Sequence, residues 1–445
     1  ENAIGRFGRS LAAGDGRYRA LEDVLARALP RVDGHGPGTP LDDGADPVAA
    51  AERLAPALSD SYLVIQGPPG TGKTFTAARA IVALLRDGRR VGITSNAHKA
   101  IDNLLAAVEA AARAAGVRFH GVKKAGSASS AYDGPFVESV YDNGAVPPDA
   151  DLIAGTAWLF ARAEFDQSRD VLVVDEAGQV SLGHLVAAGT AARNLILVGD
   201  QMQLPQPTQG SHPGEAGLST LDYLMRDHAT IPPERGLFLA TTRRLHPDIC
   251  GFISDAVYDG CLVAHPDLQA QRLVLNDAAD PALKPTGIAF VDADHDGCGQ
   301  RSDAEVAIVR RFVASLLEQR VRASDGRERP LGLDDIRVVA PYNMQVNALE
   351  RALPEGAQVG TVDRFQGQEA EVVIVSMATS GPEDLPRHVE FLYSRNRLNV
   401  AVSRARCLAV TVASPRLLDL PCATVDQVRL VNTLCWLRAY ANALR

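Results

Sequence analysis

A chain of 445 residues with 46% hydrophobic and 22% charged side chains has the ordinary balance of a globular protein and room for two to three domains. Because no apolar run approaches the ~20 residues that cross a bilayer, we expect no transmembrane helix and no membrane partner. A formal net charge of −9 disfavours a nucleic-acid-binding protein only weakly, since such binding needs no more than a local basic groove.

The six cysteines lie scattered, without any C-x-x-C pair. This spacing argues against a zinc or iron–sulfur site and against a disulfide framework, so we expect free thiols in a reducing, cytoplasmic compartment. The sequence begins with Glu1 and shows no signal-peptide pattern, and we interpret it as part of a longer chain.

The N-terminal stretch, residues 1–60, is interpreted as a linker with the remnant of an upstream region. One short helix is expected around residues 18–28. Residues 31–49 are rich in Gly, Pro and Asp and carry no apolar period, which predicts a loop.

From Tyr62 onwards, short apolar runs alternate with helical stretches, the pattern of a parallel α/β sheet. Residues 61–232 are predicted to form the first domain. Its predicted strands are residues 63–65, 91–94, 171–174 and 195–198, and its predicted helices are residues 74–86 and a segment around 101–108. Residues 121–150 break this rhythm with Gly, Ser, Asp and Pro, and are predicted to form an insertion or a long loop.

Residues 233–445 are predicted to form a second α/β domain. Its predicted strands are residues 288–291, 336–339, 372–375 and 408–413. Its clearest helix begins with a predicted capping box from Ser302 to Glu305. The apolar residues that follow share one face of that helix: Val306, Val309, Val313, Leu316 and Leu317. The predicted fold class is α/β, with two tandem domains built on parallel sheets.

A phosphate-binding loop is predicted between the first strand and the first helix of the first domain. It matches G-x-x-x-x-G-K-[ST] with Gly67, Pro68, Pro69, Gly70, Thr71, Gly72, Lys73 and Thr74. Glycines let backbone N–H groups turn toward the β-phosphate, and the following helix adds its positive N-terminal end. Lys73 would reach the β- and γ-phosphates, and the Thr74 hydroxyl would hold Mg²⁺.

Two acidic residues follow the predicted strand at residues 171–174. Asp175 ends that strand, which we expect beside the strand of the phosphate loop, and its carboxylate is predicted to coordinate Mg²⁺. Glu176 would then orient and deprotonate the attacking water. The predicted ligands are therefore ATP and Mg²⁺.

These motifs, taken in order, resemble superfamily 1B helicases. GPPGTGKT, SNAHKAIDNLL, DEAGQ and GDQMQLPQ lie in the first domain, and TRRLHP, VVAPYNMQV, VGTVDRFQGQE and LNVAVSRAR lie in the second. The resemblance implies two RecA-like domains with ATP bound in the cleft between them. It also implies an ATP-driven helicase or translocase that moves 5′ to 3′ on single-stranded nucleic acid.

Four further stretches narrow the resemblance to the helicase half of bacterial fusion proteins with an N-terminal RecB-like nuclease. They are GSHP, IPPERG, SMATSGPED and EFLYSRNRLNVAVSRAR. The resemblance implies an upstream nuclease domain as a partner and favours single-stranded DNA over RNA. We expect a monomer.

The resemblance also implies roles for individual residues. Gln179 would lie near the nucleotide, Gln203 would sense the γ-phosphate, and Arg244 and Arg404 would be arginine fingers. In the motif QGQE, the resemblance places Gly367 and Glu369 at the nucleotide, with Glu369 on the ribose. The residues implied to contact the nucleic-acid backbone are Asn96, His98, Lys99, Thr156, Tyr342 and Thr361.

The sequence departs from the family pattern at three places. Residues 48–61 contain no Gln where relatives carry a Gln motif upstream of the phosphate loop. Arg243 occupies the position of an aromatic residue that stacks on adenine; because arginine also stacks on bases, Arg243 stays a candidate nucleotide contact while base selectivity is left open. Gln206 replaces a proline.

Several residues keep two interpretations. Trp158 is interpreted as core packing, with a base-stacking platform as the alternative. Lys123 and Lys124 are interpreted as a solvated pair in a loop, with nucleic-acid contact as the alternative. His98 is left open between a structural and a functional role.

Two other functions compete with the helicase. One is an ATP-switched clamp that grips nucleic acid without processive unwinding, but the set Lys73, Asp175, Glu176, Arg244 and Arg404 is complete and favours the enzyme. The other is a nuclease–helicase in which this chain is only the motor, since these residues contain no nuclease-type cluster of acids and lysine.

Overall fold

A computed structural model describes residues 1–42, 44, 46–206, 210, 212–365, 367–386 and 388–444. Ser211 of the GSHP stretch and Gln366 of QGQE lie outside the described residues. The chain divides into two compact units. Unit 1 comprises Glu1–Pro68, Gly72–Gln201 and Pro205–Leu239, and unit 2 comprises Pro69–Thr71, Met202–Leu204 and Ala240–Arg445.

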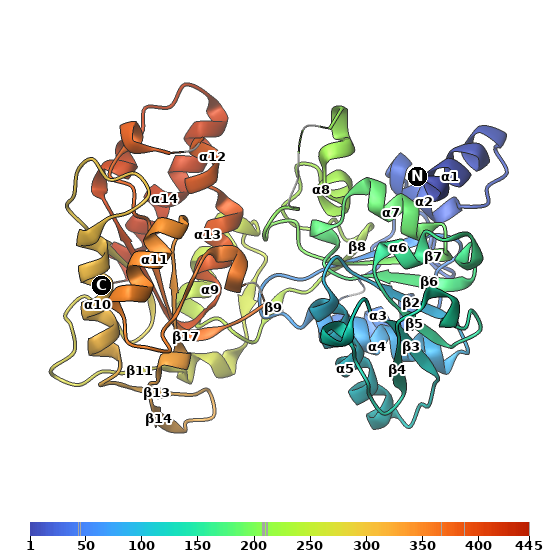
Figure 1. Ribbon diagram of the computed structural model, residues 1–445, viewed down its shortest axis with the longest axis horizontal. Helices are drawn as coiled ribbons and strands as arrows, with labels where there is room; N and C mark the ends of the chain where they lie inside the picture. Colours follow the sequence, from blue (N-terminus) through green and yellow to red (C-terminus); the bar gives the residue numbers. More distant parts are fainter. Residues whose placement is uncertain are drawn as a thin grey trace. The chain divides into compact units, whose positions relative to one another are not determined.

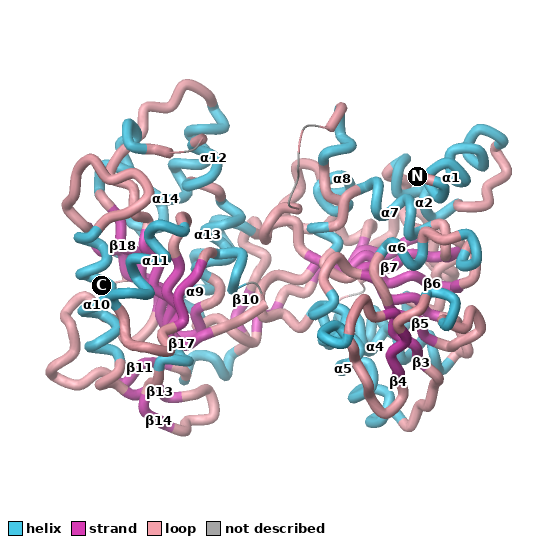
Figure 2. Tube along the Cα trace, in the orientation of Figure 1, coloured by secondary structure: helices cyan, strands magenta, loops and turns pink. Residues whose placement is uncertain are grey.

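Unit 1 is built on a sheet of eight parallel strands (Figures 1 and 2). The strands are β1 (Tyr62–Gln66), β2 (Val91–Thr94), β3 (Gly121–Lys124), β4 (Val137–Val140), β5 (Leu152–Ala154), β6 (Arg169–Val174), β7 (Ala192–Gly199) and β8 (Gly236–Phe238). Their order across the sheet is β4-β3-β5-β2-β6-β7-β1-β8. Because β8 pairs with β1, unit 1 continues past the predicted domain boundary at residue 232 and ends at Leu239.

Helices cover both faces of this sheet. They are α1 (Asn2–Ala13), α2 (Arg19–Ala26), α3 (Pro47–Leu54), α4 (Lys73–Arg86), α5 (His98–Ala115), α6 (Ala157–Phe160), α7 (Leu182–Gly189) and α8 (Thr220–Met225). Alternate residues of β1 enter opposite cores, as period-two strands require. Leu63 and Ile65 pack with α3, α4 and α5, whereas Tyr62 and Val64 pack with α2, α7 and α8.

The N-terminal residues belong to this unit, so the interpretation of residues 1–60 as a linker is wrong. α2 forms where a short helix is predicted, and its Leu21 and Val24 are almost fully buried. Phe7 of α1 joins the same core, and α1 packs against α7. These apolar side chains anchor the N-terminal helices to unit 1 through burial.

The predicted insertion at residues 121–150 contains two strands of the sheet. β3 pairs in parallel with β5 on one side and with β4 on the other. β3 carries two lysines and β4 carries a glutamate and a serine, so neither strand shows the continuous apolar run by which the other strands are predicted.

Unit 2 is built on a sheet of five parallel strands in the order β12-β18-β17-β15-β16. These are β12 (Gly287–Asp292), β15 (Ile336–Val339), β16 (Gln358–Gly360), β17 (Ala370–Ser376) and β18 (Ala405–Ala413). Five shorter strands form two small sheets: β9 (Thr241–Thr242) with β10 (Val263–Ala264), and β11 (Arg272–Val274), β13 (Arg320–Arg322) and β14 (Glu328–Pro330). The helices are α9 (Pro247–Val257), α10 (Asp303–Leu316), α11 (Asn343–Ala352), α12 (Val389–Leu392), α13 (Arg395–Val402) and α14 (Val425–Ala443) (Figure 2).

Only half of the predicted capping box forms at the start of α10. The Ser302 side chain accepts a hydrogen bond from the Glu305 N–H at 3.3 Å, as a cap does. The N–H of Ser302 donates instead to Oε1 of Gln345 at 2.9 Å. The Glu305 carboxylate is fully buried and accepts hydrogen bonds from Ser376 Oγ at 2.6 Å and from the Ala378 N–H at 2.9 Å. Packing in the core therefore overrides the local capping pattern.

Among the described residues, every helix is too short or too polar to cross a membrane.

Candidate nucleotide and nucleic-acid sites

The loop between β1 and α4 has a backbone suited to holding phosphate. Gly70 and Gly72 adopt left-handed φ values of 75° and 85°, which glycine enters without the strain that a Cβ imposes. α4 begins at Lys73 and runs for 14 residues, so its free N–H groups and its dipole face the loop. Nζ of Lys73 donates to the carbonyl oxygen of Gly67 at 2.6 Å, which keeps the ammonium over the loop.

Asp175 follows β6 directly and is 6% exposed. Its N–H donates to the carbonyl oxygen of Thr94 at 2.9 Å, which ties it to the end of β2. Burial, and then the neighbouring charge of Glu176, raise the pKa of Asp175 to about 7, although the Glu176 N–H and the Lys73 ammonium act in the opposite direction. The Asp175 carboxylate is thus an anion that a bound cation would stabilise.

The prediction that the strand before Asp175 lies beside the strand of the phosphate loop is wrong. β7 lies between β6 and β1 in the sheet. All three strands run parallel, so their carboxyl ends share one edge. Asp175 and the phosphate loop therefore follow strands that end at the same edge, where open α/β sheets bind their ligands.

Glu176 stands in a left-handed conformation, with φ of 54° and ψ of 41°. A single turn, η4 (Ala177–Gln179), follows it, and Nε2 of Gln179 donates to Oε2 of Glu176 at 3.5 Å. A Cβ on Gly178 would lie 2.7 Å from the carbonyl oxygen of Asp200, so only glycine fits there. Left-handed non-glycine residues are strained and concentrate at functional sites, which supports the predicted role of Glu176.

The donor set near Asp175 fits a magnesium ion. The Thr74 hydroxyl in the first turn of α4 and the Asp175 carboxylate are the oxygen ligands that Mg²⁺ prefers. Close by, the buried hydroxyls of Thr94 and Ser95 find no hydrogen-bond partner among the described residues. Oxygen donors that lack partners, next to a carboxylate with a raised pKa, form an environment in which a hydrated cation is stabilised.

The predicted nucleotide residues of unit 2 form a charged cluster of their own. Nε of Arg244 donates to Oε2 of Glu369 at 2.6 Å, and its Nη1 donates to the carbonyl oxygen of Ser403 at 3.5 Å. Arg406 lies 3.6 Å from Glu369. Arg404 is 3% exposed, whereas Arg243 is exposed, and Gly367 has a left-handed φ of 77°. The roles of these residues toward a nucleotide stay predictions.

Gln203 also belongs to unit 2, in the short segment Met202–Leu204. Two asparagines of α13 hold this segment by its backbone: Nδ2 of Asn396 donates to the Gln203 carbonyl at 2.6 Å, and Nδ2 of Asn399 donates to the Met202 carbonyl at 2.8 Å. The sequence motif does not indicate these asparagines. Their role as backbone clamps depends on contacts between residues far apart in the sequence.

Three of the four predicted nucleic-acid residues of unit 1 line two neighbouring grooves. Asn96 and Thr156 line a groove of about 600 Å³, and Nδ2 of Asn96 donates to the Gln179 carbonyl at 2.6 Å. His98 and Thr156 line a second groove of about 280 Å³. Burial, followed by the charge of Lys123, lowers the pKa of His98, so its ring is neutral near pH 7. Lys99 is exposed.

Two interpretations from the sequence are wrong at this surface. Trp158 does not pack in the core, because its side chain is 74% exposed and lines both grooves. Lys123 is not a solvated loop residue, because it lies on β3 with no exposed surface. Its Nζ pairs with Asp102 and donates to the Ser130 carbonyl at 2.6 Å. Lys124 lines the smaller groove.

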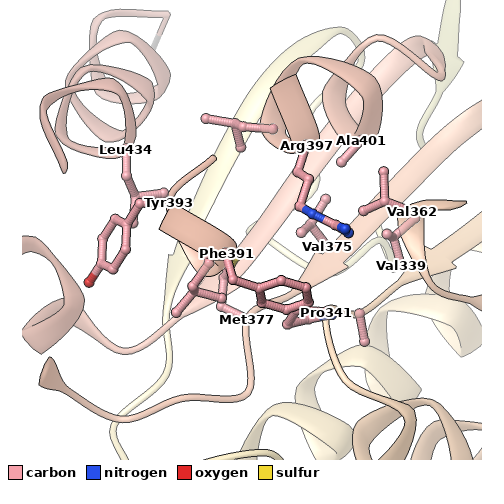
Figure 3. Close-up of a pocket in the computed structure, with 13 residues that line it drawn as sticks. Val339, Pro341, Val362, Val375, Met377, Phe391, Tyr393, Arg397, Ala401 and Leu434 are labelled. Atoms are coloured by element: carbon pink, nitrogen blue, oxygen red, sulfur yellow. The ribbon is translucent and has the colours of Figure 1, made fainter. Parts of the chain in front are cut away.

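In unit 2, the predicted residues Tyr342 and Thr361 line one groove of about 330 Å³. The Phe391 ring stacks on Tyr342 with centroids 5.6 Å apart, and the Arg397 guanidinium lies 4.5 Å from the centre of the Phe391 ring. Figure 3 shows Phe391 and Arg397 together beside an adjoining apolar pocket that Met377 also lines. Phe391 is not predicted as a site residue, although its place between charged residues in EFLYSRNR is a usable signal.

Comparison with known proteins finds similarity along most of the chain. Two family models, both described as an AAA domain, match residues 48–220 and residues 217–416. A DNA replication ATP-dependent helicase/nuclease from Arabidopsis thaliana is 26% identical over 380 residues, which are 80% of this chain and 27% of that protein. DNA-binding protein SMUBP-2 from Rattus norvegicus is 33% identical over 53% of this chain and 24% of its own length.

Both halves of the chain therefore match models described as an AAA domain, and the chain is similar to relatives named as ATP-dependent helicases. The predicted fold class, α/β with two RecA-like domains on parallel sheets, is confirmed by these matches and by the two sheets. The chain spans about a quarter to a third of the length of the curated relatives that it matches. Among solved structures, an arterivirus helicase bound to DNA matches 82% of this chain and 62% of its own chain, with 17% identity and a TM-score of 0.45.

Proposed function

We propose that this chain is an ATP-dependent helicase or translocase on single-stranded nucleic acid, which hydrolyses ATP to ADP and phosphate. One observation carries the proposal. The phosphate loop with Lys73 and the buried Asp175 with its neighbour Glu176 follow parallel strands that end at the same edge of one sheet. Relatives named as ATP-dependent helicases support the assignment.

In the proposed reaction, the Lys73 ammonium and the N–H groups at the start of α4 bind the β- and γ-phosphates. Glu176 accepts a proton from the attacking water, whose oxygen forms a bond to the γ-phosphorus. The bond from that phosphorus to the bridging oxygen breaks, and ADP leaves with the electron pair. Thr74 and Asp175 would hold Mg²⁺, which when bound neutralises charge on the phosphate oxygens.

For the nucleic acid, we propose single-stranded DNA and movement from 5′ to 3′. Relatives named as DNA replication helicase/nucleases and as a DNA-binding protein support DNA. The proposal includes an upstream nuclease domain in the full-length protein, because the helicase/nucleases from Arabidopsis thaliana and Schizosaccharomyces pombe are much longer than this chain. These relatives are eukaryotic, so they do not support the narrower likeness to bacterial fusion proteins.

The test is steady-state ATP turnover with and without single-stranded DNA, at low and at moderate salt, with Lys73→Ala as the blank. We expect strong stimulation that weakens as salt rises, because phosphate contacts release counterions. Turnover stimulated by RNA but not by DNA would reassign the substrate. Absence of turnover with either polymer would contradict the motor, and strand displacement supported by a non-hydrolysable analogue would favour the clamp.

A further inference from the structure

The indole of Trp158 is held out into solvent by a rigid support. Trp158 is 74% exposed, whereas the two residues that follow it in α6, Leu159 and Phe160, are 3% and 0% exposed. The Phe160 ring fits against β2 so closely that a Cβ on Gly92 would lie 2.9 Å from it. With this much exposed surface on an anchored turn, the indole contributes little to the core, so its place beside the grooves decides what it can do.

Trp158 stands on the wall between the two grooves of unit 1. Together with Thr156, it lines both the groove of about 600 Å³ and the groove of about 280 Å³. On one side the ring of His184 lies edge-on to the indole, with centroids 6.0 Å apart and planes at 64°. This arrangement is a favourable geometry for two aromatic rings.

The lining of these grooves suits a polyanion. The protein has a net charge of −9 and 54 acidic residues, yet none of the described residues that line the two grooves is acidic. The smaller groove carries Lys124 and Arg162. Nζ of Lys124 donates to the Ala125 carbonyl at 2.7 Å, and Arg162 pairs with Glu164 at 2.6 Å. Both cations are therefore held beside Trp158 by neighbouring groups.

We propose that Trp158 is a stacking platform for one base of the single-stranded nucleic acid, with the backbone passing Thr156 from one groove to the other. This inference rests on the proposed function and names a contact that its motifs do not assign. Every base has a π-face, so the platform accepts any of the four bases and contributes affinity without sequence preference. The flanking cations and hydroxyl contact the phosphates.

The two tryptophans of the chain, Trp158 and Trp436, make a direct test possible. Trp436 lies on α14 in unit 2 and packs edge-on against Phe252, so Trp436→Phe is a conservative change. In that background Trp158 is the single indole. Titration with oligothymidylate, without nucleotide, is expected to quench its fluorescence. An oligonucleotide of the same length with abasic sites is expected to bind with little quenching.

The affinity for oligothymidylate can be measured in the same Trp436→Phe background. We expect Trp158→Ala to weaken oligothymidylate binding by about 5- to 150-fold, the range for one stacked base, and Trp158→Phe to keep most of it. The abasic strand should bind wild type and Trp158→Ala equally. The dependence of affinity on salt should be unchanged in both variants, because the phosphate contacts remain.

The outcomes separate this inference from the proposed function. Equal affinity of Trp158→Ala and wild type for oligothymidylate, with DNA-stimulated ATP turnover intact, overturns the platform and leaves the motor standing. Quenching by the abasic strand as strong as by oligothymidylate also overturns it. Quenching of Trp158 by an added protein domain but not by oligothymidylate would assign this surface to a protein partner instead. A wild type that neither binds DNA nor responds to it contradicts the proposed function itself.

Discussion

The backbone N–H of Glu176 donates a hydrogen bond to Oδ1 of Asp175 at 2.9 Å, from a residue with a left-handed φ of 54°. This bond occupies one oxygen of the buried Asp175, whereas the Glu176 residue is half-buried. The two adjacent carboxylic acids therefore differ in exposure, since Asp175 is buried and Glu176 is only partly buried. That difference suits one to hold a cation and the other to accept a proton.

Glu176→Gln is expected to lower DNA-stimulated ATP turnover by about 10²- to 10⁴-fold, because the amide no longer accepts a proton from water. ATP affinity should change little, since the phosphate loop is untouched. Single-turnover hydrolysis and equilibrium ATP binding measure the two effects separately. Glu138→Gln is the matched control, because the Glu138 side chain is 68% exposed on an edge strand, and its turnover should equal that of wild type.

Asp175→Asn is expected to stabilise the nucleotide-free protein at high pH. The folded pKa of Asp175 is raised to about 7, so the folded state loses stability as the pH rises from the unfolded value near 4 through the folded pKa. The advantage of the variant should therefore grow over that window and level off above pH 7. Thermal unfolding from pH 4 to pH 8 measures it, and an advantage independent of pH would contradict the assignment.

Ser302→Ala and Glu305→Ala are expected to differ in cost although both residues belong to one sequence motif. Losing the cap costs about 1 kcal/mol. Losing the Glu305 carboxylate leaves the Ser376 hydroxyl and the Ala378 N–H buried without their acceptor, which costs about 3 kcal/mol. Urea unfolding of unit 2, followed by Trp436 fluorescence in a Trp158→Phe background, compares the two variants. Equal losses of unfolding free energy in the two variants would show that the buried hydrogen bonds of the Glu305 carboxylate contribute no more than the Ser302 cap.

Lys99→Ala is expected to weaken single-strand binding and to reduce the slope of log affinity against log salt by about 0.7, the value for one phosphate contact. Lys99 is exposed, next to His98 at the start of α5. The contrasting variant is Lys123→Met, which should leave the slope unchanged, because Lys123 is buried against Asp102. A lower slope for Lys123→Met would place that residue on the nucleic acid after all.

The sequence predicts those parts of the fold that depend on local pattern. Buried strands of the central sheets and the helix with Ile101, Leu104, Leu105 and Val108 follow from periodicity, and all four side chains are fully buried. The phosphate loop can be predicted from the spacing of its glycines. The strand β3 cannot be predicted in this way, because two adjacent lysines are typical of a solvated loop. The burial of Lys123 depends on its ion pair with Asp102, which the sequence does not show.

The remaining errors concern contacts between residues far apart in the sequence. Glu305 matches a capping box, but the acceptor that Ser302 needs comes from Gln345 in another helix. Trp158 resembles a core residue by composition alone, and its exposure depends on how α6 meets β2. Such positions show where tertiary packing overrides local preference.

The order of strands in unit 1 has a consequence for synthesis on the ribosome. β1 lies between β7 and β8, so one of its hydrogen-bonding edges stays uncovered until β7 has been made at Gly199, and the other until β8 has been made at Phe238. An apolar strand with open edges invites pairing with other chains. During synthesis, the apolar strand β1 (YLVIQ) therefore has an unpaired edge that can aggregate with other chains. Mutations that delay the pairing of β8 with β1 should reduce the soluble yield before they affect catalysis.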